Sequence, residues 1–397
     1  MQAKRLVIGT AFAVSMAVVA ACGSSGGSNN GGTFTPPNLT AATTLPPAEG
    51  ALNILAWPGY AENGSTDPAY NWVGPFEKKT GCKVNVKTFG TSDEAFELFK
   101  SGQYDVVSAS GDASLRLVAG GYVEPVNTSL VPNYADIIPD LKNQPWNTVN
   151  GVNYGIPHGR GANILMYNKA LVTPAPTSWT SVFDANSPYK GKVTAYGGPI
   201  YLADAALVLM KTQPDLKITN PYALDQKQFD AAVALLQTQR PLINEYWTDA
   251  AKQIDAFKGK TPSTVIGTSW QYQANTLGNT VGSVQPTEGS TGWSDTWMIG
   301  AKSPHKGCAY RWANYIVSPS VNNQVAEYFG EAPANSKSCA IDAAAKANCA
   351  TFHAQDQAYW KNVYYWTTPI AKCLDGRTNV KCIDYSQWQD AFARVKG

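Results

Sequence analysis

Between residues 51 and 120 the sequence alternates short apolar runs with amphipathic stretches, and this order strongly limits the fold. The apolar runs predict strands at "ALNILAW" (51–57), "KVNVKTFG" (83–90) and "YDVVSAS" (104–110), and the other stretches predict helices at 69–81, 92–102 and 114–121. A β-α-β-α-β order predicts an open, mostly parallel sheet with helices on both faces. In such sheets, ligands bind beyond the carboxyl ends of the strands.

A second αβ run follows, and the chain then returns to the first pattern. This run predicts strands at 192–198 and 263–270 and helices at 201–212 and 227–239, and the later part predicts a strand at 296–303 and a helix at 307–319. From Ala51 onward the chain is near the upper size limit of a single domain. We therefore expect an α/β protein of two lobes, with at least two chain crossings between them.

The N-terminus predicts export. A basic start precedes an apolar run that is too short for a membrane-spanning helix but typical of a signal peptide over 1–21. The sequence "VAAC", which ends at Cys22, resembles a bacterial lipobox, in which Cys22 is lipidated; the alternative is an ordinary secretory signal with a spare cysteine. Residues 22–50 contain few large apolar side chains and predict a flexible tether. We therefore expect an extracytoplasmic protein that is anchored to the cell membrane by lipid.

Charge and composition argue against nucleic acid as a partner. The chain has 31 Lys and Arg against 29 Asp and Glu, and removal of 1–21, which carries Lys4 and Arg5, leaves 29 of each. A protein without net positive charge has no evident attraction to nucleic acid or to an anionic membrane surface. The 12 Trp and 20 Tyr are many for a chain that is only 15% charged. Such residues suit ligand surfaces that need flat apolar faces with a polar edge, or they belong to the core.

Besides Cys22 the chain has six cysteines, an even number that predicts three disulfides in an exported protein. Two close pairs would each close a short C-terminal loop, which leaves a distant third pair: Cys339 with Cys349, Cys373 with Cys382, and Cys82 with Cys308. Metal binding is the alternative, but there is no C-x-x-C motif, and the three histidines (His158, His305, His353) are scattered. We expect neither a metal nor a cofactor.

Eight segments occur in the order found in extracytoplasmic solute-binding proteins of ABC importers. They are "ILAWPGYAE", "FEKKTGCKV", "SGQYDVVSAS", "YGIPHGRGANILMYN", "TSWTSVFD…YKGKV", "VIGTSWQYQA", "WSDTWMIGAKSPHKG" and "FGEAPAN". The chain resembles the spermidine/putrescine-binding group most, over most of 51–340. The resemblance implies a type II periplasmic-binding fold with a ligand cleft between its lobes. It also implies an N-lobe of 51–158 plus 294–338, a C-lobe of 159–293 plus 339–397, and a monomer that delivers its ligand to an ABC permease.

The stretch "GWSDTWMIGAK" (292–302) places Asp295 between two tryptophans, Trp293 and Trp297. A protonated amine is recognised by a carboxylate for its charge and by aromatic faces for its methylenes and for cation–π attraction. The resemblance implies that Asp295 is the ligand carboxylate and that further ligand contacts come from Trp293, Trp270, Trp57, Tyr60 and Ser110. The alternative is that Asp295 caps a turn and both tryptophans are core. Trp57 and Tyr60 are equally compatible with ordinary packing.

The sequence departs from the family's polyamine binders at three places. The polyamine binders have further acids directly after the segment that matches "KVTAY". These acids are missing here, since Asp204 lies too far along the chain to correspond to them. Arg160 stands in "PHGRG" where they have a Trp, and Glu331 in "FGEAPAN" replaces their Tyr. A cationic Arg160 is unfavourable for a polycation unless it is neutralised, so it could pair with Glu331, bind a ligand carboxylate or face solvent at the hinge. Asp112 and Glu62 are nearby acids that could replace the missing ones.

We therefore expect a transport protein and not an enzyme. A serine hydrolase would need a G-x-S-x-G elbow, and "GTSWQ" and "GSTGW" do not supply one. A glycosidase pair of carboxylates depends on spatial separation and is not tested by sequence. The expected ligand is a small, polyamine-like cationic amine. The alternatives are a zwitterionic amine such as an amino acid or an opine, a carbohydrate bound by the aromatic residues, and a tethered surface protein without a transport role.

Overall fold

The structure is a computed structural model, and it describes residues 35–397. The predicted signal peptide, Cys22 and the first part of the predicted tether lie outside the described residues. Within 35–397, no helix has both the length and the apolar character needed to cross a membrane.

The first sheet contains the three strands predicted between residues 51 and 110, and two later strands complete it. Its order is β2-β1-β3-β14-β6; β1 is parallel to β2 and β3, and β14 is antiparallel to β3 and β6. The strands are β1 (Ala51–Ala56), β2 (Lys83–Thr88), β3 (Val106–Ala109), β6 (Ile156–Pro157) and β14 (Thr296–Ile299). The predicted open, mostly parallel arrangement of the first three strands is confirmed.

The second sheet is built from the middle of the chain and has the order β10-β9-β11-β8-β12. β9 is parallel to β10 and β11, whereas β8 is antiparallel to both of its neighbours. Its strands are β8 (Ile164–Asn168), β9 (Val193–Tyr196), β10 (Ile243–Trp247), β11 (Ile266–Ser269) and β12 (Val281–Val284).

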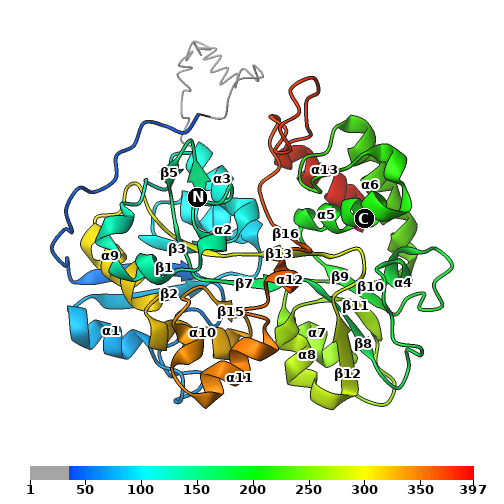
Figure 1. The fold of residues 1–397 in the computed structure, drawn as a ribbon, viewed down its shortest axis with the longest axis horizontal. Coiled ribbons are helices and arrows are strands. Elements are labelled where there is room, and N and C mark those ends of the chain that lie inside the picture. The colour runs from blue at the N-terminus through cyan, green and yellow to red at the C-terminus, as the bar shows by residue number, and fades with distance from the viewer. Residues whose placement is uncertain (1–34) are drawn as a thin grey trace, which may run out of the picture. The chain divides into compact units, whose positions relative to one another are not determined.

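A smaller third sheet, with the order β15-β7-β13-β16, lies where the chain passes between the other two. Its strands are β7 (Gly159–Ala162), β13 (Ser290–Trp293), β15 (Ala332–Pro333) and β16 (Val363–Tyr365). In the chain, β7 connects β6 of the first sheet to β8 of the second, and β13 connects β12 back to β14. Figure 1 shows β7 and β13 running between the two halves. We call these four strands the hinge sheet. The lobe boundaries expected from the sequence stay a prediction, because the described residues, 35–397, form one compact unit.

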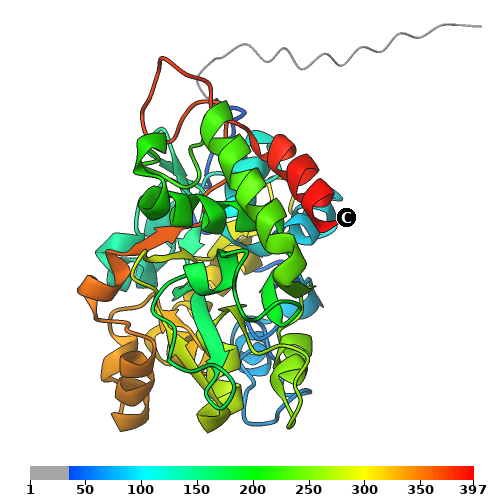
Figure 2. The ribbon, with the colours of Figure 1, turned by 90° about the vertical axis from the view of Figure 1, so that its right-hand side faces the viewer.

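Helices cover the two large sheets (Figures 1 and 2). The helices of the first half include two that form after the chain has returned to it. They are α1 (Val73–Thr80), α2 (Ser92–Lys100), α3 (Gly111–Ala119), α9 (Lys306–Ile316) and α10 (Pro319–Phe329). Those of the second are α4 (Thr180–Phe183), α5 (Leu202–Thr212), α6 (Gln226–Gln239), α7 (Ala250–Phe257), α8 (Gln271–Leu277) and α13 (Tyr385–Lys396). The short helices α11 (Ala343–Thr351) and α12 (Gln357–Trp360) precede β16. The C-terminal helix α13 packs against α6, with the Trp388 and Phe229 ring centroids 6.0 Å apart.

Much of the aromatic content is core, as one interpretation of the composition allowed. Separate apolar clusters underlie the two large sheets, the first including Trp72, Trp297 and Trp312 and the second Trp179 and Trp247. Burial of such large side chains provides much of the driving force for folding each half. The aromatic residues near the hinge sheet are also largely buried, and Trp270, Trp293 and Trp366 belong to the second cluster.

The last part of the predicted tether is bound to the first half of the molecule and is not free. Asn127 Nδ2 donates to the Ala42 carbonyl at 3.0 Å, and Arg311 Nη1 donates to the Pro46 carbonyl at 2.7 Å. The Glu49 carboxylate accepts from the backbone N–H groups of Gly307 (2.8 Å) and Cys308 (3.0 Å) at the start of α9. These contacts satisfy N–H groups that a helix start leaves unpaired and place a negative charge at its positive end. This part of the predicted tether is therefore held by polar contacts. A prediction based on its few large apolar residues does not detect such contacts.

Three disulfides stabilise the fold, with the pairing that the sequence predicts. They are Cys82–Cys308, Cys339–Cys349 and Cys373–Cys382. The first joins the start of β2 to α9 across 226 residues of sequence, whereas the others span 10 and 9 residues.

Loss of the long-range disulfide should cost more stability than loss of a local one. The chain-entropy model gives about 5 kcal/mol for a loop as long as that of Cys82–Cys308 and about 3 kcal/mol for a loop of the Cys373–Cys382 size. Both pairs are buried, so replacement of each pair by alanine gives a matched comparison. Denaturant unfolding should place the Cys82→Ala/Cys308→Ala protein at the lower midpoint. An equal or larger loss in the Cys373→Ala/Cys382→Ala protein would contradict this view.

Candidate functional site

Asp295 lies in the two-residue connection between β13 of the hinge sheet and β14 of the first sheet, and it is only 2% exposed. Its Oδ1 accepts a hydrogen bond from Ser110 Oγ at 2.5 Å, and its Oδ2 accepts from the Tyr60 hydroxyl at 2.9 Å. Ser110 is the N-cap residue of α3, and Tyr60 follows β1. The structure therefore brings Asp295, Ser110 and Tyr60 together at the carboxyl ends of β1 and β3. Both hydrogen bonds join Asp295 to residues far away in the sequence, so its side chain does not act as the cap of a local turn.

Glu331 contributes a second buried carboxylate at the same place. It lies between α10 and β15 and is fully buried, and its Oε2 is 2.9 Å from the same Tyr60 hydroxyl that contacts Asp295. Its Oε1 is 3.5 Å from His158 Nε2. Two carboxylates therefore share one hydroxyl group inside the protein.

His158 and Trp297 complete the surroundings of Glu331. Trp297 Nε1 donates to His158 Nδ1 at 3.0 Å, so the histidine hydrogen lies on Nε2, which faces Glu331. Burial lowers the pKa of His158 to about 3, so the ring is neutral near neutral pH. Trp297 itself packs in the core against Trp312, with ring centroids 5.7 Å apart. Of the two tryptophans beside Asp295, Trp297 therefore belongs to the core of the first half and orients His158, whereas Trp293 belongs to the apolar cluster of the second half.

Trp57 contacts the site through Ser110. Its indole Nε1 donates to Ser110 Oγ at 3.2 Å, and its backbone N–H donates to Ser108 Oγ at 3.0 Å. The ring also lies 6.4 Å from Trp270, edge to face. Trp57 thus both orients Ser110 toward Asp295 and forms part of an aromatic wall.

Four aromatic rings form a closed circuit of neighbours at the hinge sheet: Trp270, Trp293, Trp366 and Tyr196. The successive ring centroids are 5.3, 6.3, 5.3 and 6.2 Å apart around the circuit. Trp270 and Trp293 were expected at the site, whereas Trp366 and Tyr196 were not. Trp366 follows β16, where its backbone N–H donates to the Gly292 carbonyl at 2.7 Å, and its position depends on a strand pairing between distant segments. Tyr196 is the last residue of β9, and this position at a strand end is the sequence signal that could have identified it as a site residue.

Two glycines of "PHGRG" make room for these groups. A Cβ atom on Gly159 would lie 2.4 Å from the Glu331 carboxyl group, and one on Gly161 would lie 2.0 Å from the Trp293 ring. Such distances are far below any contact that side chains tolerate. The glycines of β7 therefore allow a carboxylate and an indole to lie against the backbone of the hinge sheet.

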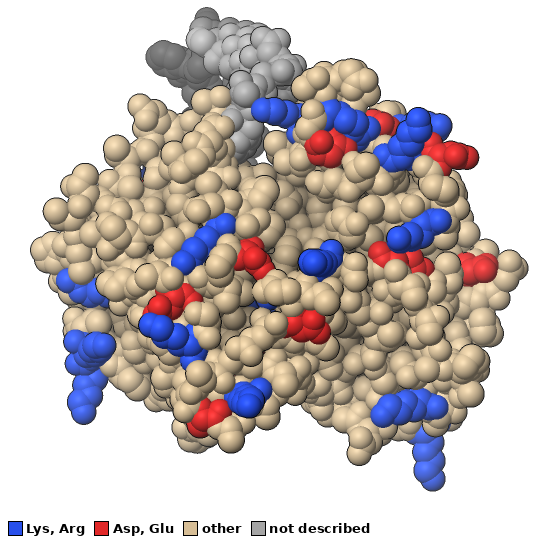
Figure 3. Space-filling model, in the orientation of Figure 1, with Lys and Arg blue, Asp and Glu red and all other residues tan. Residues whose placement is uncertain are grey.

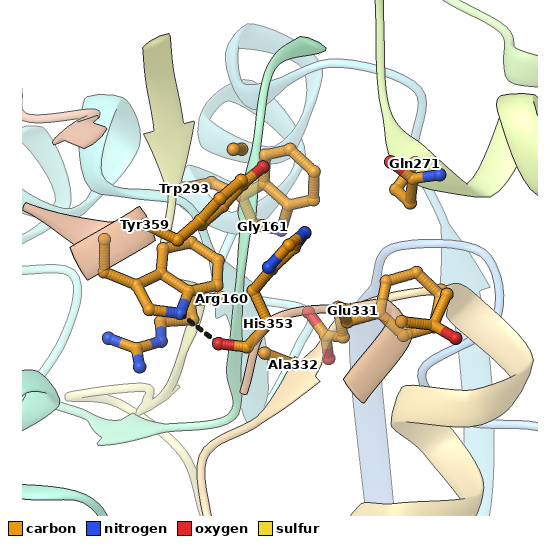
Figure 4. Close-up of a pocket in the computed structure, with 13 residues that line it drawn as sticks. Arg160, Gly161, Gln271, Trp293, Glu331, Ala332, His353 and Tyr359 are labelled. Carbon is orange, nitrogen blue, oxygen red and sulfur yellow. Dashed lines mark hydrogen bonds between the residues drawn. The ribbon is translucent and has the colours of Figure 1, made fainter. Parts of the chain in front are cut away.

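Arg160, between those glycines, neither faces solvent nor pairs with Glu331. It is fully buried, with its guanidinium 4.2 Å from the centroid of the Trp360 ring and its Nη2 donating to the Ala354 carbonyl at 3.1 Å. Its Nη1 donates to the Tyr365 hydroxyl at 3.3 Å. Figure 4 shows the guanidinium pointing away from the Glu331 carboxylate. The hinge-surface position is therefore wrong, because the C-terminal segment covers this side chain, and no ion pair with Glu331 is formed.

Two further buried carboxyl groups lie near the hinge. Asp112, in the first turn of α3, accepts from Ser92 Oγ at 2.7 Å and lines a small cavity together with Tyr196. It lies beside the Asp295 network and is not hydrogen-bonded to it. Asp204 in α5 accepts from Thr291 Oγ1 at 3.1 Å. Burial raises the pKa of Asp112 to about 6 and that of Asp204 to about 8.

Burial also controls the charge of the central pair. It raises the pKa of Asp295 to about 7, while hydrogen bonds from Ser110 and Tyr60 act in the opposite direction. Burial and the nearby Asp295 charge both raise the pKa of Glu331 well above its usual value. Near neutral pH the pair is therefore costly to ionise fully without a cation.

A cavity of about 590 Å³ lies between segments of both halves of the molecule, next to this network. Trp57, Trp270 and Phe329 line it, and Phe329 in turn packs 4.5 Å from the Tyr60 ring. Its acidic lining residues are Glu62, Glu94 and Asp249, and none of the described lining residues is basic. Its size is within the range of pockets that bind small molecules. Elsewhere, on the face in Figure 3, basic and acidic side chains are interspersed without a broad patch of one sign.

Metal coordination is a poor account of these acids. Within the described part of the chain, no group of three or more His, Cys, Asp or Glu side chains is arranged to hold a metal ion.

Comparisons with known proteins agree on one family. The family described as bacterial extracellular solute-binding protein matches residues 71–352. The spermidine/putrescine-binding periplasmic protein of Escherichia coli (strain K12) is 26% identical over 295 residues, which cover 71% of this chain and 81% of that protein.

Solved structures show the same fold. The spermidine/putrescine ABC transporter substrate-binding protein of Streptococcus pneumoniae has a TM-score of 0.64 at 21% identity, covering 87% of this chain and 98% of that one. The periplasmic-binding protein MotA of A. tumefaciens, in complex with glucopine, also has a TM-score of 0.64, at 19% identity, covering 87% and 100%. The expected α/β fold of two lobes with a ligand cleft between them is confirmed.

The buried carboxyl groups should make the ligand-free protein less stable as pH rises from about 6.5 to about 8. Over this range the unfolded chain has already released these protons, whereas folded Asp295 and Asp204, with pKa values of about 7 and 8, still hold part of theirs. His158 acts weakly in the opposite direction near pH 6.5, because the unfolded chain still holds part of a proton on it there, whereas the folded ring is neutral. Urea unfolding at the two pH values measures the loss. Asp204→Asn should reduce it, and a stability that rises with pH over this range would contradict the assignment.

Proposed function

This chain belongs to the bacterial extracellular solute-binding proteins, and on that premise we propose that it captures a small, polyamine-like cationic amine in the interlobe cleft and delivers it to an ABC permease. Proteins of this family serve transport as binding components and are not enzymes. They act outside the cytoplasm, in keeping with the expected export signal. Lipidation at Cys22 and a monomeric state are further parts of this proposal.

The distribution of charge is the observation that carries the proposal. Asp295 and Glu331 are both nearly or fully buried at one Tyr60 hydroxyl, and the only histidine facing Glu331 within 35–397, His158, is neutral. Arg160, the guanidinium close in sequence, is directed toward Trp360 instead. A buried carboxylate without a basic partner is destabilising unless it gains a cation or a proton. A ligand ammonium supplies the missing charge.

The aromatic residues suit the rest of such a ligand. Methylene groups of an amine pack on flat rings, and an ammonium over a ring gains about 0.5–2 kcal/mol. Trp270 and Trp293 belong to the aromatic circuit beside Asp295, and Trp57 extends it into the acidic cavity. Three acidic side chains and no basic one line that cavity among the described residues, so the field within it favours a cation.

A zwitterionic ligand is less well supported. Such a ligand was considered because Arg160 could bind its carboxylate. The guanidinium instead contacts the Trp360 ring, the Tyr365 hydroxyl and the Ala354 carbonyl. The glucopine complex of the A. tumefaciens protein shows that this fold accommodates ligands other than polyamines. A carbohydrate would use the aromatic faces but would not need two buried acids.

Asp295→Asn should weaken putrescine or spermidine binding by at least about a hundredfold, because an amide cannot balance a buried ammonium. Asp204→Asn is the matched control, since it changes a buried Asp in α5 that is bonded to Thr291 and should leave the affinity unchanged. Calorimetric titration of both variants measures the effect. A screen of putrescine, spermidine, γ-aminobutyrate and maltose by thermal shift precedes it. Unchanged amine affinity in Asp295→Asn, or stabilisation by maltose alone, would overturn the proposed ligand.

A further inference from the structure

We propose that, in the ligand-free protein, Asp295 and Glu331 share one proton across Tyr60, and that this proton is released to solvent when a dicationic amine binds. Glu331 is then a specificity-determining residue, because its ionisation adjusts the charge of the site to that of the ligand. The inference rests on the proposed function, since it concerns the same cleft and the same class of ligand.

Hydrogen-bond donors approach the pair from both ends. Trp57 Nε1 donates to Ser110 Oγ, which leaves the serine hydrogen for Asp295 Oδ1 at 2.5 Å. At the other end, Trp297 Nε1 donates to His158 Nδ1, which leaves the histidine hydrogen on Nε2, facing Glu331 Oε1 at 3.5 Å. The outer oxygen of Asp295 therefore accepts a hydrogen bond, whereas the His158–Glu331 contact places a neutral imidazole beside Glu331 without forming a hydrogen bond.

The centre of the network lacks one hydrogen. The Tyr60 hydroxyl is 2.9 Å from both Asp295 Oδ2 and Glu331 Oε2, yet a phenol carries a single hydrogen. If both carboxyl groups were ionised, one of these two oxygen–oxygen contacts would contain no hydrogen and would be repulsive. One additional proton on either carboxyl group completes both contacts, because the protonated group donates to the Tyr60 oxygen while Tyr60 donates to the other. The geometry therefore requires one proton on the pair.

No other charged group takes the role of that proton. Of the titratable groups that face the pair, His158 is neutral, Tyr60 has a pKa raised well above its usual value by burial, and Tyr196 is held neutral in the same way. Asp112, the nearby acid, is negative or neutral and can only favour the proton. The Arg160 guanidinium is directed to Trp360.

The charge of the ligand decides what happens to the proton. With the proton, the pair has a single negative charge and matches a monocation. Without it, the pair has two negative charges and matches a dication such as putrescine, whose ammonium groups supply N–H donors to the carboxylates. Binding of the dication lowers the proton affinity of the pair, and the proton passes from the carboxyl group to the buffer.

Calorimetric titration with putrescine in two buffers of different ionisation enthalpy, at about pH 7, counts the protons released. The ligand-free wild-type protein should release about one proton per putrescine bound, and n-butylamine, a monocation of similar length, should release close to none. In Glu331→Gln, which binds more weakly, the release on putrescine binding should fall well below that of the wild-type protein, because only Asp295 can still give up a proton. Infrared difference spectra of the wild-type protein give a second readout that needs no variant. A protonated-carboxyl band should disappear when putrescine is added.

The outcomes separate the two proposals. If the wild-type protein binds putrescine with equal heats in both buffers and keeps its infrared band, the proton exchange is wrong and the amine site stands. If butylamine releases as many protons as putrescine, the matching of charge is wrong. If the wild-type protein binds neither amine, the proposed function itself fails.

Discussion

The sharing of one Tyr60 hydroxyl by two buried carboxyl groups, Asp295 and Glu331, is the constraint on which the site depends. A carboxylate inside a protein is tolerated when a cation, a proton or several hydrogen-bond donors compensate for lost hydration. Here the donors come from Ser110 and Tyr60, and neither brings a positive charge. The site is therefore short of one positive charge, and a captured cation supplies it. Binding energy of this kind also favours the closed arrangement, because the two acids are brought to the hydroxyl by different segments.

The hinge sheet makes this arrangement possible. β13 leads directly to Asp295, β15 follows Glu331, and β7 lies between β13 and β15 in the sheet. Gly159 and Gly161 of β7 carry no side chains, so the Glu331 carboxyl and the Trp293 ring lie against its backbone. A change of angle between the lobes would act on these same strands. The elements that connect the lobes thus also carry the ligand groups, which is how capture of a small molecule can be coupled to a closure that a permease detects.

The sequence predicts the fold well but the site only in part. The alternation of apolar runs located every strand of the first sheet up to β3, and the expected cysteine pairs are those of the structure. Asp295, Ser110 and Tyr60 were expected at the site from the resemblance to the spermidine/putrescine-binding group. Trp366 was missed because its place depends on β16 pairing with β13, which no local pattern reveals. Arg160 was misplaced because alternate residues of β7 face opposite sides, and the C-terminal segment covers the side on which Arg160 lies.

A crystal structure of the protein with putrescine tests the central claim most directly. The account predicts that the ammonium groups of putrescine lie within hydrogen-bond distance, about 2.7–3.2 Å, of carboxylate oxygens of Asp295 and of Glu331. It also predicts that the methylenes lie on the rings of Trp270 and Trp293. A structure in which putrescine occupies only the outer acidic cavity, with Tyr60 still bridging the two carboxyl groups, would contradict it.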